Sequence, residues 1–435
     1  MNNIQLFVVG SEDPPCAGDA PPAHTTRKQT DMAEAVIVAT ARTPIGRAFK
    51  GSLIEERADD LTATIIQAAM DKVPALTPDV IDDLHLGCGL PGGEQGFNMA
   101  RVVTTLLGWD VPGTTLTRYC ASSLQTTRMA FHAIKAGEAD AIVSAGVEMV
   151  SRFIKGSSDS LPDTQNPRFD EAQQRTQDRS MGAEDWEDTV PLDTLPDIYI
   201  PMGQTAENVA AIKGISREAQ DDWGYESQMR YAKADAEGFW AREITPITLA
   251  NGETLAKDDS PRANTDRDAM RDLKPAFRPD GTVTAGNACP LNDGAAAVII
   301  MSDTKAAELG LTPLARIVST GVSALNPEIM GLGPIGASQD ALKKAGMRVN
   351  DIDIVEINEA FAAQVLPSAD ELGIDADKLN PHGGAIAVGH PFGMTGARIT
   401  GTLLNGLQTK DGTFGLETMC VGGGQGMALI IERLS

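Results

Sequence analysis

The chain of 435 residues is short of positive charge and has no long apolar segment. Its 36 lysine and arginine residues face 60 aspartate and glutamate residues, which gives a net charge of −24. This balance argues against a surface that binds nucleic acid or an anionic membrane, and a polyanionic ligand would need cations placed locally around it. No apolar run approaches the roughly 18 residues that a membrane-spanning helix needs. We therefore expect no nucleic-acid partner and no membrane span.

Cysteine and histidine are also scarce, with five residues each, and neither shows the paired spacing of a zinc site. No metal site is therefore expected. An odd number of cysteines in a large chain without a secretory signal indicates reduced thiols, as in the cytoplasm. Residues 1–31 are polar, contain prolines and differ in character from the rest, so they are expected to be a disordered extension or a tag, with Met32 as a candidate natural start.

Short apolar strands alternate with amphipathic helices on both sides of a polar central segment, which is the pattern of an α/β protein. The first half is expected to combine residues 32–150 with 272–305, and residues 306–435 to form a second half with the same rhythm, which suggests an internal duplication. Residues 151–271 are rich in Asp, Gln, Pro and Arg and are expected to form an inserted loop or lid domain over the α/β body. The predicted strands are 36–39, 82–89, 141–146, 244–247, 295–301, 315–318, 352–357, 418–421 and 427–432, and the predicted helices are 61–73, 98–107, 205–212 and 217–237.

Cys120 directly precedes a run of apolar residues with helical spacing from Leu124 to Ile134, and Gly137 supplies a stop. A thiol at the start of a helix lies among free backbone N–H groups and at the positive end of the helix dipole, which lowers its pKa toward the reactive thiolate. Cys120 is therefore a candidate nucleophile. The alternative is a buried structural cysteine, the commoner fate of a free thiol.

Three further candidates lie at predicted strand ends or in glycine-rich turns of the second half. His390 lies in the segment 383–396, where glycines allow the backbone to approach a ligand closely. Cys420 ends a predicted strand just before three glycines, and Asn358 follows another strand, where the sites of α/β proteins collect. The alternatives are a histidine that is merely hydrogen-bonded, a phosphate-binding glycine loop with an incidental cysteine, and a helix N-cap at Asn358.

Taken in order, the segments that hold these residues resemble the thiolase family, the acetyl-CoA acetyltransferases and 3-ketoacyl-CoA thiolases. Seven segments in the family order over about 400 residues are highly specific, although each is weak alone. The matching segments are VIVATARTPIG at 36–46, RYCASSLQ at 118–125, MGQTAEN at 202–208, TAGN at 284–287 with NDGAA at 292–296, NEAF at 358–361, GHP at 389–391 and CVGGG at 420–424.

The resemblance implies a thiolase fold, with two duplicated mixed-sheet α/β halves in a five-layered αβαβα body and an inserted loop domain. It implies that Cys120 is the acylated nucleophile, that His390 draws its proton, and that Cys420 moves protons at the α-carbon of the substrate. Asn358, through a bound water, and His390 would face the thioester oxygen, and the backbone N–H groups of Cys120 and Gly422 would face the acyl oxygen. The implied reaction is thiolytic cleavage of a 3-ketoacyl-CoA, or the reverse condensation, through an acyl-cysteine.

The resemblance also implies coenzyme A and acyl-CoA as substrates with no permanently bound cofactor, a homodimer or homotetramer, and substrate contacts by Met202, Cys289 and Phe361. Many members have Ser where this chain has Cys289, and the chain lacks the His-Met element of short-chain members, which leaves a longer or bulkier acyl chain open. Candidate cations for the CoA phosphates in the inserted segment are Arg152, Lys155, Arg230, Arg242 and Lys257.

Two rival functions are a decarboxylating ketoacyl synthase and a catalytically silent acyl-CoA- or lipid-binding relative. The second active-site cysteine, Cys420, counts against the synthase. The joint presence of Cys120, Asn358, His390 and Cys420 counts against the silent relative.

Overall fold

The structure is a computed structural model, and it describes residues 33–156, 163–182, 186–189 and 193–435. The predicted extension at 1–31 lies outside the described residues. No helix in the described part of the chain is long and apolar enough to cross a lipid bilayer.

A mixed β-sheet runs through the described chain in the strand order β10-β11-β12-β9-β1-β8-β5-β3-β4, and β2 pairs with β8 beside this path. The strands are β1 (Ala35–Arg42), β2 (Gly46–Arg47), β3 (Asp83–Cys88), β4 (Gly113–Leu116), β5 (Ala141–Met149), β8 (Asn292–Ser302), β9 (Ala315–Ala324), β10 (Ile354–Ile357), β11 (Phe414–Val421) and β12 (Gln425–Arg433). Every residue of β5 and β8 is buried, as is usual for strands with helices on both faces.

The two ends of the sheet repeat one pairing scheme. In the first half, β3 pairs parallel with β5, β5 antiparallel with β8, and β8 antiparallel with β1. In the second half, β10 pairs parallel with β11, β11 antiparallel with β12, and β12 antiparallel with β9. The halves join where β1 pairs with β9 at Val36↔Arg316 and Ile37↔Ala315. The shared scheme confirms the internal duplication.

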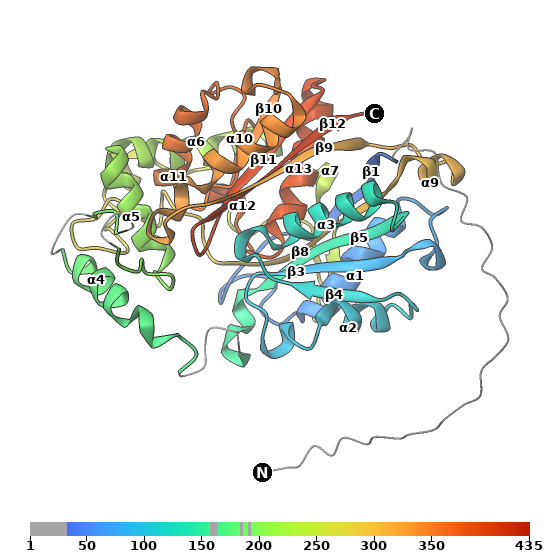
Figure 1. Cartoon of the computed structure of the whole chain (residues 1–435), viewed down its shortest axis with the longest axis horizontal. Helices are drawn as coiled ribbons and strands as arrows, with labels where there is room; N and C mark the ends of the chain where they lie inside the picture. Colours follow the sequence, from blue (N-terminus) through green and yellow to red (C-terminus); the bar gives the residue numbers. More distant parts are fainter. Residues whose placement is uncertain (1–32, 157–162, 183–185, 190–192) are drawn as a thin grey trace, which may run out of the picture. The chain divides into compact units, whose positions relative to one another are not determined.

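Helices separate and cover the two halves of the sheet, which gives five layers (Figure 1). Helices α3 (Ser122–Ala136) and α13 (Thr395–Lys410) pack against each other between the halves. Helices α1 (Ala58–Met70) and α2 (Met99–Leu106) cover the outer face of the first half, and α10 (Gly333–Ala345) and α11 (Ala362–Leu372) cover that of the second. Each large side chain buried in these layers, such as Ile299, contributes roughly 1.5–3 kcal/mol to the free energy of folding.

The central segment consists mainly of helices and loops. It contains α4 (Asp170–Ser180), α5 (Met202–Lys213), α6 (Arg217–Ala236), α7 (Phe239–Glu243), α8 (Arg267–Arg271) and a short hairpin of β6 (Ile247–Thr248) and β7 (Thr254–Leu255). The strand predicted at 244–247 is not continuous: Ile244 forms an isolated bridge with Arg42, Ile247 begins β6, and Pro246 between them has no N–H to pair. Helix α5 packs on α11, and α6 packs on α11 and on the short helix α12 (Ala385–Val388). The division at 32–150 with 272–305, 151–271 and 306–435 stays a prediction.

Candidate active site

Cys120 lies in the short 3-10 turn η3 (Tyr119–Ala121), directly before α3, which confirms its predicted place at a helix start. The backbone of Tyr119 has a φ of 44°, in the left-handed region that L side chains rarely adopt. A Cβ atom at Gly87 of β3 would collide with the backbone of Ser122, so glycine at this position lets the start of α3 lie directly against the strand. The sharp turn therefore presents Cys120 at the carboxyl ends of the parallel strands β3 and β4.

The prediction of a lowered pKa for Cys120 is wrong. Burial raises the pKa of this thiol to about 12, the charge of Glu148 adds to the shift, and a hydrogen bond from the backbone N–H of Gly422 opposes it. The free-energy cost of removing the thiolate from water is larger here than the stabilisation that the helix start gives it. Cys120 is therefore a neutral thiol at neutral pH, and it would need a base to take its proton before it could act as a nucleophile.

His390 is held as a neutral imidazole in one tautomer. Its Nδ1 lies 2.6 Å from Thr395 Oγ1, and that hydroxyl donates to the carbonyl oxygen of Pro391 at 2.7 Å. Because the single hydroxyl proton of Thr395 is used, Nδ1 of His390 must be the donor, and Nε2 is the unprotonated nitrogen that accepts. Burial, with the nearby charge of Arg398, lowers the pKa of His390 to about 3. His390 can therefore accept a proton at Nε2.

Asn358 contacts this nitrogen. Its Nδ2 lies 3.2 Å from Nε2 of His390, while its Oδ1 is buried and has no hydrogen-bond partner among the described residues. The N-cap residue of α11 is Phe361, so the alternative that Asn358 caps this helix is excluded. The amide of Gln364 donates to the carbonyl oxygen of Asn358 at 2.7 Å and fixes the turn that presents it.

Three thiols lie near one another at this place. Cys420 is fully buried at the end of β11, and Cys289 is brought in because its N–H donates to the carbonyl oxygen of Ala360 at 3.1 Å. Burial raises the pKa values of Cys289 and Cys420, and Cys120 adds to both shifts through its charge. The N–H of Gly422, two residues after Cys420, bonds to the Cys120 thiol, and the Ala360 that holds Cys289 donates its own N–H to the carbonyl oxygen of Asn358 at 3.0 Å. The structure therefore brings Cys120, Cys289 and Cys420 together with His390 and Asn358.

A cavity of about 360 Å³ opens over Cys120, and two further predicted site residues, Met202 and Gly422, line its wall. The predicted contact residue Phe361 does not line it, but packs at a ring distance of 6.1 Å on Phe277 and shares an apolar cluster with Cys420. The cavity, called the acyl cavity below, is lined by Leu90, Tyr119, Cys120, Thr164, Gln165, Ile198, Tyr199, Ile200, Met202, Phe392, Gly422 and Gly423.

Sequence reasoning missed the buried carboxylate of Glu148. It accepts hydrogen bonds from the backbone N–H groups of Gly89, Leu90 and Gly393 at 2.6, 3.1 and 2.8 Å. It thereby ties the end of β3 to the loop that follows His390. Burial raises the pKa of Glu148 to about 7 although these three donors oppose the shift. A charged residue inside the otherwise apolar strand 141–149 was the signal that could have revealed it.

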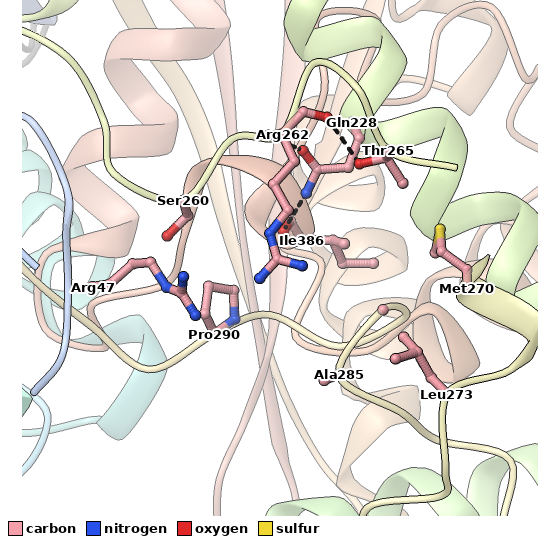
Figure 2. A pocket seen from close by; sticks show the side chains of 11 residues that line it. Arg47, Gln228, Ser260, Arg262, Thr265, Met270, Leu273, Ala285, Pro290 and Ile386 are labelled. Atoms are coloured by element: carbon pink, nitrogen blue, oxygen red, sulfur yellow. Dashed lines mark hydrogen bonds between the residues drawn. The ribbon is translucent and has the colours of Figure 1, made fainter. Parts of the chain in front are cut away.

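A second cavity, of about 60 Å³, lies beside Pro290, the neighbour of Cys289, and we call it the arginine cavity. Arg47 and Arg262 both extend toward Pro290 (Figure 2), and neither side chain has an ion-pair partner among the described residues. By contrast, the cations proposed from the sequence have partners of their own. Arg152 and Lys155 bind Glu94, Arg230 binds Glu226, Arg242 binds Asn405 and Thr409, and Lys257 lies 3.6 Å from Asp235.

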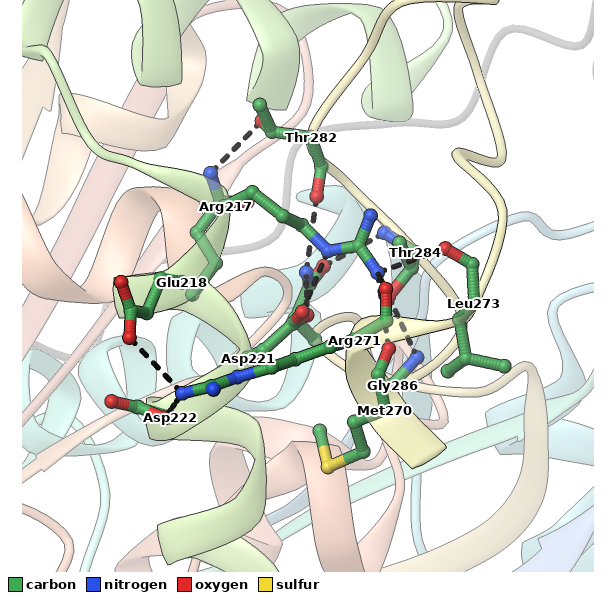
Figure 3. A network of polar contacts seen from close by, with 12 residues as sticks. Arg217, Glu218, Asp221, Asp222, Met270, Arg271, Leu273, Thr282, Thr284 and Gly286 are labelled. Carbon is green, nitrogen blue, oxygen red and sulfur yellow. Dashed lines mark hydrogen bonds and ion pairs between the residues drawn. The ribbon is translucent and has the colours of Figure 1, made fainter. Parts of the chain in front are cut away.

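A polar network fixes one wall of the arginine cavity (Figure 3). Arg217 pairs with Asp221 at 2.7 Å and donates to the carbonyl oxygens of Met270 and Leu273, which both line the cavity. Asp221 in turn accepts from the side chain of Asn287 at 2.8 Å. The loop that leads to Cys289 is therefore braced on α6.

Comparisons with known proteins agree with this geometry. The family models for the thiolase N-terminal and C-terminal domains match residues 35–304 and 311–433. The 3-oxoadipyl-CoA/3-oxo-5,6-dehydrosuberyl-CoA thiolase of Escherichia coli (strain K12) is 43% identical over 413 residues, which cover 93% of this chain and 100% of the relative. The 3-ketoacyl-CoA thiolase of Bacillus subtilis (strain 168) is 40% identical over 415 residues, covering 92% and 100%.

Solved structures give the same result. The crystal structure of human mitochondrial 3-ketoacyl-CoA thiolase in complex with CoA matches with a TM-score of 0.80 and 35% identity, over 93% of this chain and 99% of that one. Together the comparisons confirm the predicted fold and reaction class. The chain belongs to the thiolase family and is a CoA-dependent acyltransferase of that family.

Proposed function

We propose that Cys120, His390, Cys420, Asn358 and the backbone N–H of Gly422 carry out the thiolase reaction in this chain. The observation that supports this most strongly is the tautomer of His390. Its Nδ1–H is committed to Thr395, so Nε2, which accepts from Nδ2 of Asn358 at 3.2 Å, is the nitrogen that can take a proton. A neutral imidazole beside a neutral thiol is a nucleophile with its general base.

In the cleavage direction, Nε2 of His390 takes the proton of Cys120, and Sγ forms a bond to C3 of the 3-ketoacyl-CoA. The C2–C3 bond then breaks, its electron pair remains on C2 as an enolate, and the thiol of Cys420 gives its proton to C2, which releases acetyl-CoA. In the second half, the thiol of CoA attacks the acyl group, its proton goes to the Cys420 thiolate, and the proton on His390 returns to Cys120. Every group ends as it began.

Hydrogen-bond donors support the negative oxygens that form. The N–H groups of Cys120 and Gly422 face the acyl oxygen, which the hydrogen bond between Gly422 and the Cys120 sulfur supports. The enolate oxygen faces the protonated His390 and a water held by Asn358, whose buried Oδ1 needs a donor. Each such donor contributes about 3–4 kcal/mol to lowering the barrier in comparable sites.

Trapping the acyl-enzyme tests these roles. After brief exposure to an acyl-CoA, mass spectrometry of peptides should show acyl mass on Cys120 alone. Cys120→Ser should abolish the adduct, because a serine hydroxyl ionises far less readily than a thiol. Cys289→Ser should keep it, and Cys420→Ser should keep it while slowing proton transfer at the α-carbon. Acyl mass on Cys289, or an adduct that persists in Cys120→Ser, would overturn the assignment, and no adduct at all would favour a silent relative.

We also propose that Arg47 and Arg262 bind the phosphates of CoA at the arginine cavity. Two observations support this proposal: neither arginine side chain has an ion-pair partner among the described residues, and both line the cavity beside Pro290. Arg262→Gln should raise KM for CoA about tenfold with little change in kcat. The substitution should also make KM for CoA less dependent on salt concentration. Lys257→Gln is the matched control, because this exposed lysine belongs to the same segment. Unchanged KM in Arg262→Gln would refute the assignment.

Finally, we propose a cytoplasmic homodimer or homotetramer that acts in lipid metabolism, in β-oxidation. The four cysteines of the described residues are free thiols, which suits a reducing compartment. Phe97 and Ile154 are 92% and 90% exposed, and β4 is an edge strand, features that a subunit interface commonly covers. Analytical ultracentrifugation tests the assembly, and a monomer at micromolar concentration would contradict it.

A further inference from the structure

The acyl cavity is lined by side chains without formal charge. Its twelve lining residues within the described part of the chain are apolar or neutral. Ile198, Ile200 and Met202 come from the segment that leads into α5, and Tyr119 and Phe392 come from the loops that hold Cys120 and His390. A group bound to the sulfur of Cys120 therefore enters an environment of aliphatic and aromatic carbon.

Two of these side chains stand over the glycine run that follows Cys420. A Cβ atom at Gly422 would lie 3.3 Å from the ring of Tyr119, and one at Gly423 would lie 3.6 Å from Cδ1 of Ile198. Tyr119 and Ile198 thus lie so close to the turn after β11 that a side chain in place of Gly422 or Gly423 would touch them. An acyl chain that leaves Cys120 along Gly422 and Gly423 would run past both side chains.

No lysine or arginine is among the described lining residues. Arg118, which precedes the lining residue Tyr119, donates to Oε1 of Gln425 at 2.6 Å, and three cations of the neighbouring segments also have partners. Lys155 binds Glu94, Arg179 binds Glu328, and Arg175 donates to the carbonyl oxygen of Leu195. The negative charge of Glu148 acts on Cys120 and adds to the rise of its pKa that burial causes. The lining that an acyl group meets is therefore uncharged.

We infer that this enzyme transfers uncharged, apolar acyl groups and discriminates against 3-ketoacyl chains that end in a carboxylate. The inference rests on the proposed function and specifies its substrate class. A terminal carboxylate in the acyl cavity would lose water without gaining a counter-charge, which is costly. The E. coli relative is named for 3-oxoadipyl-CoA, whose chain ends in a carboxylate, so the two enzymes differ in substrate despite 43% identity.

Cleavage of two six-carbon substrates tests this directly. The substrate 3-oxohexanoyl-CoA leaves a butanoyl group on Cys120, and 3-oxoadipyl-CoA leaves a succinyl group of similar length with a terminal charge. We expect kcat/KM to be at least about tenfold higher for 3-oxohexanoyl-CoA. We also expect kcat/KM to rise about fourfold for each methylene added from six to eight carbons, the effect of burying one methylene. Equal or better cleavage of 3-oxoadipyl-CoA would overturn the inference.

A pair of variants checks that the lining of the acyl cavity is the cause. Ile198→Lys places a cation opposite Gly423, and Ile198→Met is its uncharged control of similar length. We expect Ile198→Lys to move the ratio of kcat/KM values toward 3-oxoadipyl-CoA by about tenfold and Ile198→Met to leave the ratio as it was. A ratio unmoved by the lysine would overturn the inference. Cleavage of neither substrate, nor of acetoacetyl-CoA, would instead overturn the proposed function on which the inference rests.

Discussion

Thr395 decides which nitrogen of His390 can accept a proton. The Thr395 hydroxyl donates to Pro391 and therefore accepts from Nδ1–H, while Asn292 Oδ1 accepts from the backbone N–H of His390 at 2.9 Å and fixes the loop. The imidazole thus reaches the reaction already oriented, with Nε2 unprotonated. This makes Thr395 a positioning residue that acts through His390.

Replacing Thr395 by Val should lower kcat about tenfold or more with little change in KM, because Nδ1–H loses its acceptor and the wrong tautomer becomes populated. Thr395→Ser keeps the hydroxyl and should retain most of the activity. Steady-state kinetics of the two variants across pH checks the prediction. Equal losses in Val and Ser variants would show that the methyl group matters and the hydroxyl does not.

Loss of Asn358 should act on the transition state. Asn358→Ala removes the amide beside Nε2 of His390, and by comparison with single oxyanion-hole deletions kcat should fall about 100-fold or more while KM for CoA changes little. His390→Ala should behave in the same way. A variant of Asn358 in which only KM rose would show that the residue binds substrate without stabilising charge.

The types of residues in the site could be predicted from the sequence, but their protonation could not. Cys120, His390 and Cys420 stand out because a thiol before a helix and a histidine or thiol among glycines are unusual patterns. The pKa of Cys120 could not be inferred, since the helix start favours the thiolate and burial opposes it, and only the fold shows which effect is larger.

At the scale of secondary-structure elements, Glu148 at the end of β5 ties two loops that build the acyl cavity. Its three N–H donors belong to Gly89 and Leu90 after β3 and to Gly393 ahead of α13. Leu90 and Phe392 of these loops line the acyl cavity. The carboxylate therefore couples the wall of the cavity to the position of His390.

Glu148→Gln should destabilise the protein and lower its activity. The new amide would point N–H groups at backbone N–H groups, and a buried polar group left without a partner costs about 1–3 kcal/mol. The thermal midpoint should fall, and kcat should fall with it. Glu171→Gln is the control, because the side chain of Glu171 is 87% exposed on α4. A Glu148→Gln variant as stable and active as the parent would refute the role of the carboxylate.

The positions of helices and strands could be predicted where apolar residues recur regularly. They could be predicted less well where glycines allow two elements to pack closely. Strands β1, β3 and β5 begin within one residue of their predicted starts, and α6 begins at the predicted Arg217. Helices α12 and α13, however, begin inside the segment 383–396 that looked like one glycine-rich turn. Gly396 lies within α13, and a Cβ atom there would collide with the backbone of Leu124. The glycine that suggested a loop in the sequence therefore allows α13 to pack closely against α3.

At the scale of the whole molecule, a buried cluster of charged residues lies between the two halves. Glu356 of β10 and Glu417 of β11 are register neighbours, and Arg398 of α13 acts on both. All three nitrogens of the Arg398 guanidinium, Oε1 of Glu356 and Oε1 of Glu417 are buried without hydrogen-bond partners among the described residues. Burial raises the pKa of each carboxyl group to about 8, with Arg398 opposing the shift.

These pKa values predict that stability falls as pH rises from about 6.5 to 8.5. Glu356 and Glu417 keep their protons in the folded chain up to about pH 8, whereas an unfolded glutamate loses its proton near pH 4.5, so each pH unit in between favours unfolding. Buried His390 and His382, with pKa values lowered to about 3 and 4, act in the opposite direction only below about pH 6.5, where an unfolded histidine is protonated.

The midpoint of guanidinium unfolding, measured at intervals between pH 6.5 and 8.5, checks this prediction. Each carboxyl group should cost about 1 kcal/mol per pH unit over the part of the range in which it remains protonated. Glu417→Gln mimics the protonated state and keeps an acceptor for the Thr400 hydroxyl, which lies 2.7 Å from Glu417, so its midpoint should fall less steeply. Glu371→Gln alters a carboxylate that is 47% exposed and should follow the parent curve. A parent midpoint that stayed level or rose over this range would show that Glu356 and Glu417 are ionised in the folded protein, with Arg398 as their counter-charge.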